Sequence, residues 1–273
     1  MSVLDTLREA AARLADSSAT PRLDAELLMA EALGLSRSDL LLRATDLIVP
    51  PDFEAMLERR LNHEPIAYIL GRQEFYGREF TVSPDVLIPR SDSEALIDPA
   101  IDRMGRTGSM LDLGTGSGAL LLTLLAEKPG WRGTGIDRSK AALGIASKNA
   151  HSLGLANRVV MQQRDWSKRD WMNGLGQFDL VIANPPYVEV DARLDPDVSD
   201  FEPVGALFAG KDGLDDYRRI IPLLRSLLDP EGFAVFEIGH RQDAAVTALA
   251  LEHGFAVHLV RDLANRPRGL ILT

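Results

Sequence analysis

A tetrapeptide with two prolines ends a short apolar run in the second half of the sequence. Residues 178–190 read FDLVIANPPYVEV, and the run LVIA predicts a short buried strand that stops at Asn184-Pro185-Pro186-Tyr187, here called the NPPY corner. Proline has no backbone N–H group and stiffens the turn, so the corner leaves carbonyl oxygens without competing donors. It therefore presents hydrogen-bond acceptors at the end of a strand.

Such a corner suits a planar NH2 group. The Asn184 side-chain oxygen and the Pro185 carbonyl can each accept one hydrogen bond from the same nitrogen. Amide and aromatic amino nitrogens are weak nucleophiles because their lone pair is delocalised, and holding both hydrogens fixes the direction in which the nitrogen meets an electrophile. Tyr187 can lay its ring against the substrate plane and developing positive charge. The alternative is that the two prolines only end a strand.

A glycine-rich loop lies upstream, in LDLGTGSGALLLTLLA. Gly114, Gly116 and Gly118 separate a predicted strand from a predicted helix, where glycine allows tight turns and a close approach of the backbone to a ligand. The loop lacks the Lys-Ser/Thr pair of a nucleoside triphosphate loop, and its G-x-G-x-G spacing differs from the dinucleotide pattern G-x-G-x-x-G. Alone, the loop does not define its ligand.

Two acidic positions narrow the choice. Asp137 ends the next predicted strand about 20 residues beyond the loop, where a carboxylate can accept hydrogen bonds from both hydroxyls of a ribose. Asp165 and Trp166 end the third strand, where they can contact the amino group and ring of an adenine. Together these residues predict an adenosine cofactor. The alternatives are a helix cap at Asp137, and a loop acid with a core aromatic at 165–166.

All these side chains follow strands, so they depend on one fold. After residue 91 the pattern alternates strands and helices, which predicts a mostly parallel α/β sheet covered on both faces. Ligands of such sheets bind at the carboxyl ends of the strands. The expected strands are SMLDLG, RGTGID, RVVMQQRD, FDLVIANPP, GFAVFEI and a closing pair near 255–260 and 269–273; the expected helices begin at 119 and 139, cover about 217–228, and begin at 242.

The first 70 residues have a different pattern. Apolar residues recur at helical spacing and predict a bundle of four helices, the second of which would bury Leu23, Leu27, Leu28 and Leu33 and stop at Gly34. Aromatic residues around Gly77 then predict a hairpin and connector. We therefore expect a helical domain over 1–72, a hairpin and connector over 73–90, and an α/β domain over 91–273.

Composition excludes several classes of function. The 273 residues contain no cysteine, which rules out disulfides and thiolate chemistry, and the five histidines show no metal-ligand spacing, so no metal is expected. A net charge of −10 opposes extended contact with a nucleic acid backbone. No apolar run reaches the roughly 20 residues of a membrane span, and the N-terminus lacks a signal-peptide pattern. We expect a cytoplasmic protein without direct nucleic acid or membrane binding.

Taken together, LDLGTGSG, GID, RDW and NPPY resemble class I S-adenosyl-L-methionine-dependent methyltransferases that act on exocyclic nitrogens. PRLDAELLMAEALG, EPIAYILGRQEFYGREFTVSPDVLIPR, FEPVGALFAGKDGLDDYRRI, EIGHRQ and RDLANRPRGLIL are similar to the HemK/PrmC family, over nearly the whole chain. The resemblance implies a seven-stranded Rossmann-like domain, a substrate-recognising helical bundle, and methylation of the N5 amide nitrogen of the glutamine in the Gly-Gly-Gln (GGQ) motif of class I peptide chain release factors. It implies cofactor contacts at Gly114, Thr115, Gly116, Ser117, Gly118, Asp137, Trp166 and Asn184, and substrate contacts at Asn184, Pro185, Pro186 and Tyr187.

Two segments depart from the family pattern. PRSDSE at 89–94 replaces the usual PRPETE, which shortens an acid and a hydroxyl side chain, and FAG at 208–210 replaces a double glycine. Two rival functions remain. The NPPY corner also fits the amino group of adenine in DNA or RNA, and a non-catalytic module would bind the cofactor without transferring a methyl group.

Overall fold

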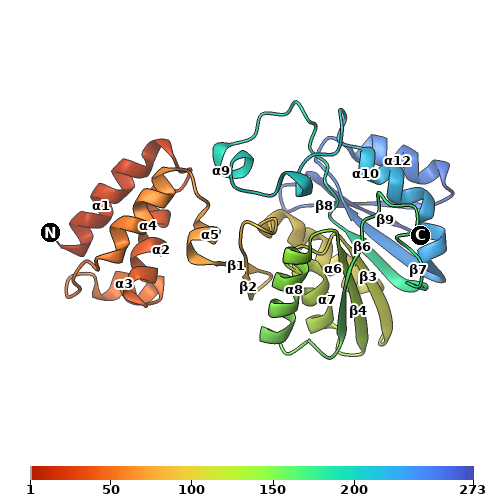
Figure 1. Ribbon diagram of the computed structural model, residues 1–273, viewed down its shortest axis with the longest axis horizontal. Helices are drawn as coiled ribbons and strands as arrows, with labels where there is room; N and C mark the ends of the chain where they lie inside the picture. The colour runs from red at the N-terminus through yellow and green to blue at the C-terminus, as the bar shows by residue number, and fades with distance from the viewer. Residues whose placement is uncertain (1) are drawn as a thin grey trace. The chain divides into compact units, whose positions relative to one another are not determined.

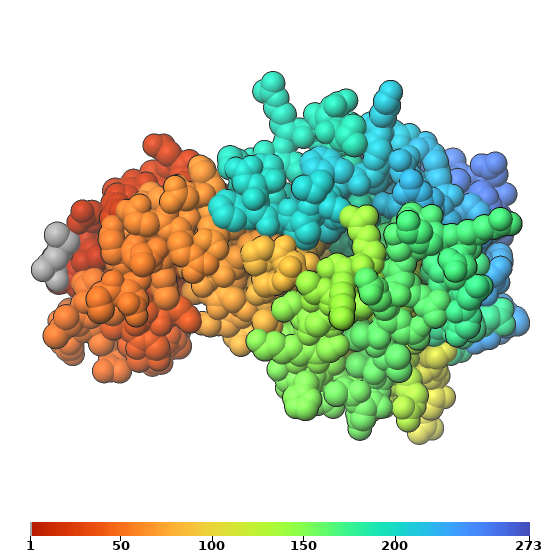
Figure 2. All heavy atoms as spheres, viewed as in Figure 1, coloured from red at the N-terminus to blue at the C-terminus, as the bar shows by residue number. Residues whose placement is uncertain are grey.

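The computed structural model describes residues 2–273 and divides the chain into two compact units (Figures 1 and 2). Unit 1 runs up to Arg72 and also includes Leu194–Phe201, a segment that follows the NPPY corner. Unit 2 comprises Gln73–Arg193 and Glu202–Thr273. Within the described residues, no helix has both the length and the apolar character needed to cross a membrane.

Unit 1 is a helical bundle, coloured red to orange in Figure 1 apart from the 194–201 segment. Its core is built from side chains such as Leu7, Leu28, Phe53 and Leu57, each at most 1% exposed. Gly34 ends the second helix with φ +64°, a conformation that glycine adopts without strain. The helices are α1 Val3–Arg13, η1 Leu14–Asp16, α2 Pro21–Leu33, α3 Arg37–Arg43, α4 Asp52–Leu61, α5 Ile66–Leu70 and, from the later segment, α9 Pro196–Ser199.

The expected buried face of α2 was wrong at Leu23, which is 39% exposed. Two acids of the helix turn inward instead. Asp24 Oδ2 accepts from Arg60 Nε at 2.8 Å, and Glu26 Oε2 accepts from Arg37 Nε at 2.8 Å. Buried carboxylates need such partners, so these ion pairs accompany the buried Leu28 and Met29 on the inward face of α2.

Unit 2 confirms the α/β fold expected from the sequence. Its seven-stranded sheet has the order β5-β4-β3-β6-β7-β9-β8. Strand β9 runs in the opposite direction to the other six strands. The chain order reverses between β3 and β6, so the switch point of the sheet lies there. The strands are β3 Gly108–Leu113, β4 Trp131–Asp137, β5 Val159–Gln163, β6 Phe178–Ala183, β7 Leu228–Glu237, β8 Val257–Arg261 and β9 Pro267–Leu272.

Successive side chains of the central strands enter two different cores. Leu180 and Ile182 pack with α6 Ile97–Arg103 and α7 Ala119–Glu127, whereas Val181 and Ala183 pack with α10 Asp215–Ile220 and α12 Asp243–Glu252. Helices α6, α7 and α8 Lys140–Ser152 therefore lie on one face of the sheet, with α10 and α12 on the other (Figure 1). Burial on both faces explains the unbroken apolar run before the NPPY corner.

Two local features complete unit 2. A hairpin of β1 Arg72–Phe75 and β2 Arg78–Thr81 turns at Tyr76 and Gly77, which both have positive φ. The helix expected near 217–228 is present, but it consists of three short segments in succession: α10, η4 Ile221–Leu223 and α11 Leu224–Leu227. Pro222 lies at the break, where it cannot donate the hydrogen bond that a continuous helix requires.

Candidate active site

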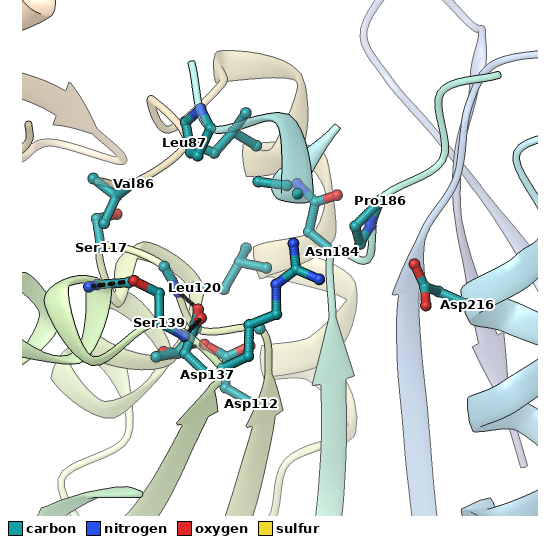
Figure 3. A pocket seen from close by; sticks show the side chains of 18 of the residues that line it. Val86, Leu87, Asp112, Ser117, Leu120, Asp137, Ser139, Asn184, Pro186 and Asp216 are labelled. Carbon is teal, nitrogen blue, oxygen red and sulfur yellow. Dashed lines mark hydrogen bonds between the residues drawn. The ribbon is translucent and has the colours of Figure 1, made fainter. Parts of the chain in front are cut away.

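A cavity of about 450 Å³ opens in unit 2 at the carboxyl ends of the strands. Small-molecule sites typically occupy a volume of this order. Its wall contains residues from the loops after β3, β4, β5 and β6, so the four sequence motifs meet in one place (Figure 3). The predicted site residues that line it are Gly114, Thr115, Gly116, Ser117, Asp137, Asp165, Trp166, Asn184 and Pro186; among the described residues, Gly118, Pro185 and Tyr187 are not part of its lining.

The glycine loop is held tightly against the sheet. The backbone N–H groups of Gly114 and Thr115 both donate to the carbonyl of Ile136, each at 2.9 Å. All three loop glycines have positive φ, with Gly118 at +83° before the first residue of α7. A Cβ on Gly118 would lie 2.9 Å from Leu122 Cδ1, so this glycine serves the packing of α7. Gly114 and Gly116 instead bring bare backbone to the cavity wall.

A buried acid beneath the loop was missed in the sequence. Asp112, 2% exposed, accepts a 2.7 Å hydrogen bond from the Thr115 hydroxyl. Burial raises the pKa of Asp112 to about 7. The signal was the acid itself, in the middle of an apolar strand that ends at the glycine loop. Its contact shows that Thr115 fixes the loop to β3.

Asp137 closes the loop from the neighbouring strand. Its two carboxylate oxygens accept from Gly116 N at 3.0 Å and from Ser139 N at 2.8 Å. A carboxylate has about four acceptor positions, so two backbone donors leave capacity for the hydroxyl groups of a ligand. Ser139 caps α8 by accepting from Ala142 N at 3.1 Å, which gives the helix cap a residue other than Asp137. Asp137 and Ser139 face the cavity side by side (Figure 3).

Trp166 packs over the glycine loop. A Cβ added to Gly114 would lie 3.0 Å from the indole, and the indole N–H donates to Asp216 Oδ1 at 2.8 Å. Asp216 in turn pairs with Arg219 at 3.0 Å. Asp165 is half-buried beside them, and a hydrogen bond from Ser167 holds its pKa below the usual range, so it is ionised at neutral pH. Trp166 thus connects the loop after β3 to α10.

The NPPY corner stands opposite Asp137 across the cavity (Figure 3). The half-buried Asn184 lines the cavity, and no other described residue hydrogen bonds to its carboxamide. Pro185 and Pro186 are buried. The Tyr187 ring packs against the core on the α10 side, and its hydroxyl donates to Glu237 Oε1 at 3.4 Å. Burial raises the pKa of Tyr187 well above its ordinary value, so the hydroxyl keeps its proton.

Two further segments line the cavity, although none of their residues was predicted to bind a ligand. Arg90 and Ser93 come from the PRSDSE segment, and residues 208–210 come from FAG, so the departures from the family pattern lie on the cavity itself. Glu202, 4% exposed, accepts from Ile88 N at 3.2 Å and from the Arg90 guanidinium. The departures in the sequence were the only signal for these walls.

Comparisons with known proteins identify the family of each part of the chain. Residues 5–71 match the PrmC N-terminal domain family, and residues 106–237 match a methyltransferase domain family. A release factor glutamine methyltransferase from Pseudomonas aeruginosa is 41% identical over 92% of this chain and 92% of its own length. The enzyme of the same description from Rhodospirillum rubrum is 39% identical, over 92% of this chain and 78% of its own length.

Solved structures support the fold. A ribosomal protein L11 methylase from Lactobacillus delbrueckii subsp. bulgaricus matches 74% of this chain and 89% of its own, with a TM-score of 0.50 and 21% identity. A methyltransferase from Pyrococcus furiosus matches 72% of this chain and 89% of its own, with a TM-score of 0.50 and 13% identity. At such identities the likeness concerns the fold alone. By its identity and coverage, the chain belongs to the family of release factor glutamine methyltransferases.

Proposed function

We propose that this protein transfers a methyl group from S-adenosyl-L-methionine to the N5 amide nitrogen of the glutamine in the GGQ motif of class I peptide chain release factors. One observation carries the proposal. A single cavity brings the glycine loop and Asp137 together with Asn184 and Pro186 of the NPPY corner. The cofactor side and the NH2-binding side of the predicted reaction therefore share one wall.

The residues present fit this cofactor. Bare backbone at Gly114 and Gly116 allows close approach, and Asp137 keeps acceptor capacity for the ribose hydroxyls. Asp165 lines the same cavity, which supports the proposal that it accepts from the adenine amino group, and Trp166 lies beside Gly114. When bound, the cofactor supplies an electrophilic methyl group on a sulfonium.

On the substrate side, Asn184 performs the central task. Its side-chain oxygen accepts one N–H group of the glutamine amide, and this fixes the nitrogen for in-line displacement. Acceptance of the second N–H group by the Pro185 carbonyl stays a prediction, because Pro185 is not part of the cavity lining. The substrate nitrogen gives up one proton after the methyl group has transferred, so no strong base is needed at the corner. Packing of the Tyr187 ring against the substrate plane stays a prediction.

Unit 1 is the proposed grip on the release factor. The domain bounds 1–72, 73–90 and 91–273 remain our proposal, with the 194–201 segment added to the helical unit. We place the reaction in the cytoplasm, without direct contact to nucleic acid.

The test uses cofactor with a labelled methyl group and a purified class I release factor. We expect label on the intact factor and none on a factor whose GGQ glutamine is alanine. Double-stranded DNA and RNA, offered separately, test adenine methylation, which the net charge of −10 disfavours. Label on nucleic acid alone, or cofactor binding without transfer to any substrate, would overturn the proposal.

A further inference from the structure

The segment Glu237 to Gln242, EIGHRQ, has no role in the reaction described so far, although it lies against the NPPY corner. Phe236 of β7 pairs with Ala183 of β6, so Glu237 and Asn184 are the next residues of adjacent parallel strands. Glu237 accepts from the Tyr187 hydroxyl at 3.4 Å. Gln242, five residues later, donates from Nε2 to the Tyr187 carbonyl at 3.0 Å. The segment therefore contacts Tyr187 at both its side chain and its backbone.

Gln242 is itself fixed in place. Its Oε1 accepts from Gly239 N at 3.0 Å, which orients the side chain so that its NH2 group faces Tyr187. Gly239 also brings the turn close to the ring, because a Cβ at this position would lie 3.4 Å from Tyr187 Cδ2. The turn after β7 thus packs closely against the Tyr187 ring.

Glu237 is an unusual residue to find at this place. It is 1% exposed, and its Oε2 has no hydrogen-bond partner within the described part of the chain. Arg268, the nearby cation, is bonded to Asp92 and lies 3.7 Å from Asp262, and its Nε also has no hydrogen-bond partner within the described part of the chain. A buried carboxyl group with one long hydrogen bond contributes little to stability and is costly to desolvate. Its presence is better explained by what it holds.

We infer that Glu237 and Gln242 are positioning residues that clamp Tyr187 by its hydroxyl group and its carbonyl oxygen, and so hold the NPPY corner in the geometry for methyl transfer. The inference rests on the proposed function. Tyr187 directly follows Pro186 in the NPPY corner. If Tyr187 lost these contacts, the corner would move, and with it the acceptors that orient the substrate NH2 group. Displacements of about 1 Å at such a site lower rates by up to about a hundredfold.

The first test compares Glu237→Leu, Tyr187→Phe and the double variant in the release factor assay. We expect each single variant to lower kcat by about tenfold to a hundredfold while cofactor affinity stays unchanged. The double variant should be no slower than the slower single variant, because both remove the same contact. Additive losses, or a normal kcat in Glu237→Leu, would overturn the role of Glu237.

Thermal unfolding separates positioning from simple loss of structure. Glu237→Leu removes a buried carboxyl group, so its unfolding midpoint should equal or exceed that of the wild type while kcat falls. Should Glu237→Leu lose stability, Glu237→Gln decides, since it keeps the shape and an acceptor for Tyr187 and should recover most of kcat. An inactive but well-folded Glu237→Gln would contradict the clamp.

Gln242→Glu isolates the other half of the clamp. Its carboxylate still accepts from Gly239 N but no longer donates to the Tyr187 carbonyl, so kcat should fall. Asp179→Asn is the matched control for the acidic position. Asp179 is a half-buried acid near the amino end of β6 and accepts from Ser109 N at 2.7 Å, so this variant should retain wild-type kcat. A normal kcat in Gln242→Glu would remove Gln242 from the proposal.

The pH profile provides a readout that a structural role would not move. Burial raises the pKa of Glu237 to about 7, and the ionised form is the stronger acceptor for Tyr187. We expect wild-type kcat to fall as pH drops through about 7, and Glu237→Gln to lack this step. The groups that face Glu237 are Tyr187, Tyr217 of α10, Arg268 of β9, and Asp92 and Ser93 of η2 Ser91–Leu96.

A step that persists in Glu237→Gln would assign the titration to another group and overturn this part of the inference. The outcomes also separate the two proposals. A wild-type protein that never methylates a release factor defeats the proposed function. Normal wild-type turnover with unaffected Glu237 and Gln242 variants defeats the clamp alone.

Discussion

At the scale of single residues, Asn184 and Asp137 face one cavity but differ in how many hydrogen bonds their side chains already make. No other described residue bonds to the Asn184 carboxamide, whereas the Asp137 carboxylate already accepts from Gly116 N and Ser139 N. A polar side chain without partners at a cavity wall is available to a ligand, and a preorganised carboxylate holds its ligand without rearranging. We therefore expect the two residues to govern different steps.

Variants at these two positions should separate catalysis from binding. Asn184→Ala removes an oxygen that orients the substrate, so kcat should fall by about a hundredfold or more with cofactor affinity almost unchanged. Asp137→Asn removes a charged acceptor, and calorimetry should show cofactor affinity weakened by about tenfold to a hundredfold. Cofactor binding that is lost in Asn184→Ala and kept in Asp137→Asn would reverse the assignment.

The residues predicted from the sequence share one property. Asp137, Asn184 and the loop glycines stand directly after strands, where the local pattern alone places them at the ligand edge of the sheet. Ser93 and Asp216 line the cavity only because distant segments fold beside it, and Glu202 holds wall residues in the same way. Their neighbours in the sequence hold no information about those contacts, so periodicity could not find them.

At the scale of elements, two constraints favour glycine in the loop: the positive φ of the backbone and the lack of space for a Cβ. Gly114 and Gly154 have nearly the same positive φ, +74° and +70°. A Cβ on Gly114 would press on the Trp166 ring at 3.0 Å, whereas a Cβ on Gly154 would meet nothing within 4 Å. Alanine variants at Gly114 and Gly154 therefore distinguish the effect of backbone strain from the effect of crowding at the cavity wall.

Gly114→Ala should weaken cofactor binding by at least about tenfold, because Trp166 must move away from the loop and from Asp216. Gly154→Ala should cost about 1–2 kcal/mol of stability from its backbone conformation and leave cofactor affinity unchanged. Calorimetry and thermal unfolding of both variants measure the two effects. Equal cofactor affinity in the two variants would show that Trp166 does not form a binding wall.

The sheet was easier to predict than the helices. All seven strands were expected near their observed positions, and a strand buried on both faces, such as β6, appears as a continuous apolar run. The expected inward face of α2 was wrong at Leu23 and omitted Asp24, which is buried by its ion pair with Arg60, a residue 36 positions away. Pairings between distant charges are not encoded in the spacing of leucines.

At the scale of the whole molecule, each unit has its own core, and the cavity belongs to one of them. Every residue that lines the cavity comes from unit 2, whereas Leu57 lies in the core of unit 1 at 1% exposure. Binding of the cofactor should therefore depend on the integrity of unit 2. Recognition of the release factor, on our proposal, should depend on unit 1.

Leu57→Ala tests whether unit 1 serves recognition of the release factor while unit 2 binds the cofactor. Truncation of a buried leucine costs about 2–5 kcal/mol, and the loss falls on the helical core. Below the unfolding temperature of the variant, we expect calorimetry to give wild-type cofactor affinity and kinetics to give a raised KM for the release factor.

Leu124→Ala is the matched control, because Leu124 is fully buried in unit 2. This variant should weaken cofactor binding as it loosens α7 behind the glycine loop. Parallel loss of cofactor affinity in both variants would mean that the helical unit supports the cofactor site as well, because a core lesion confined to unit 1 could not otherwise reach Asp137 and Trp166.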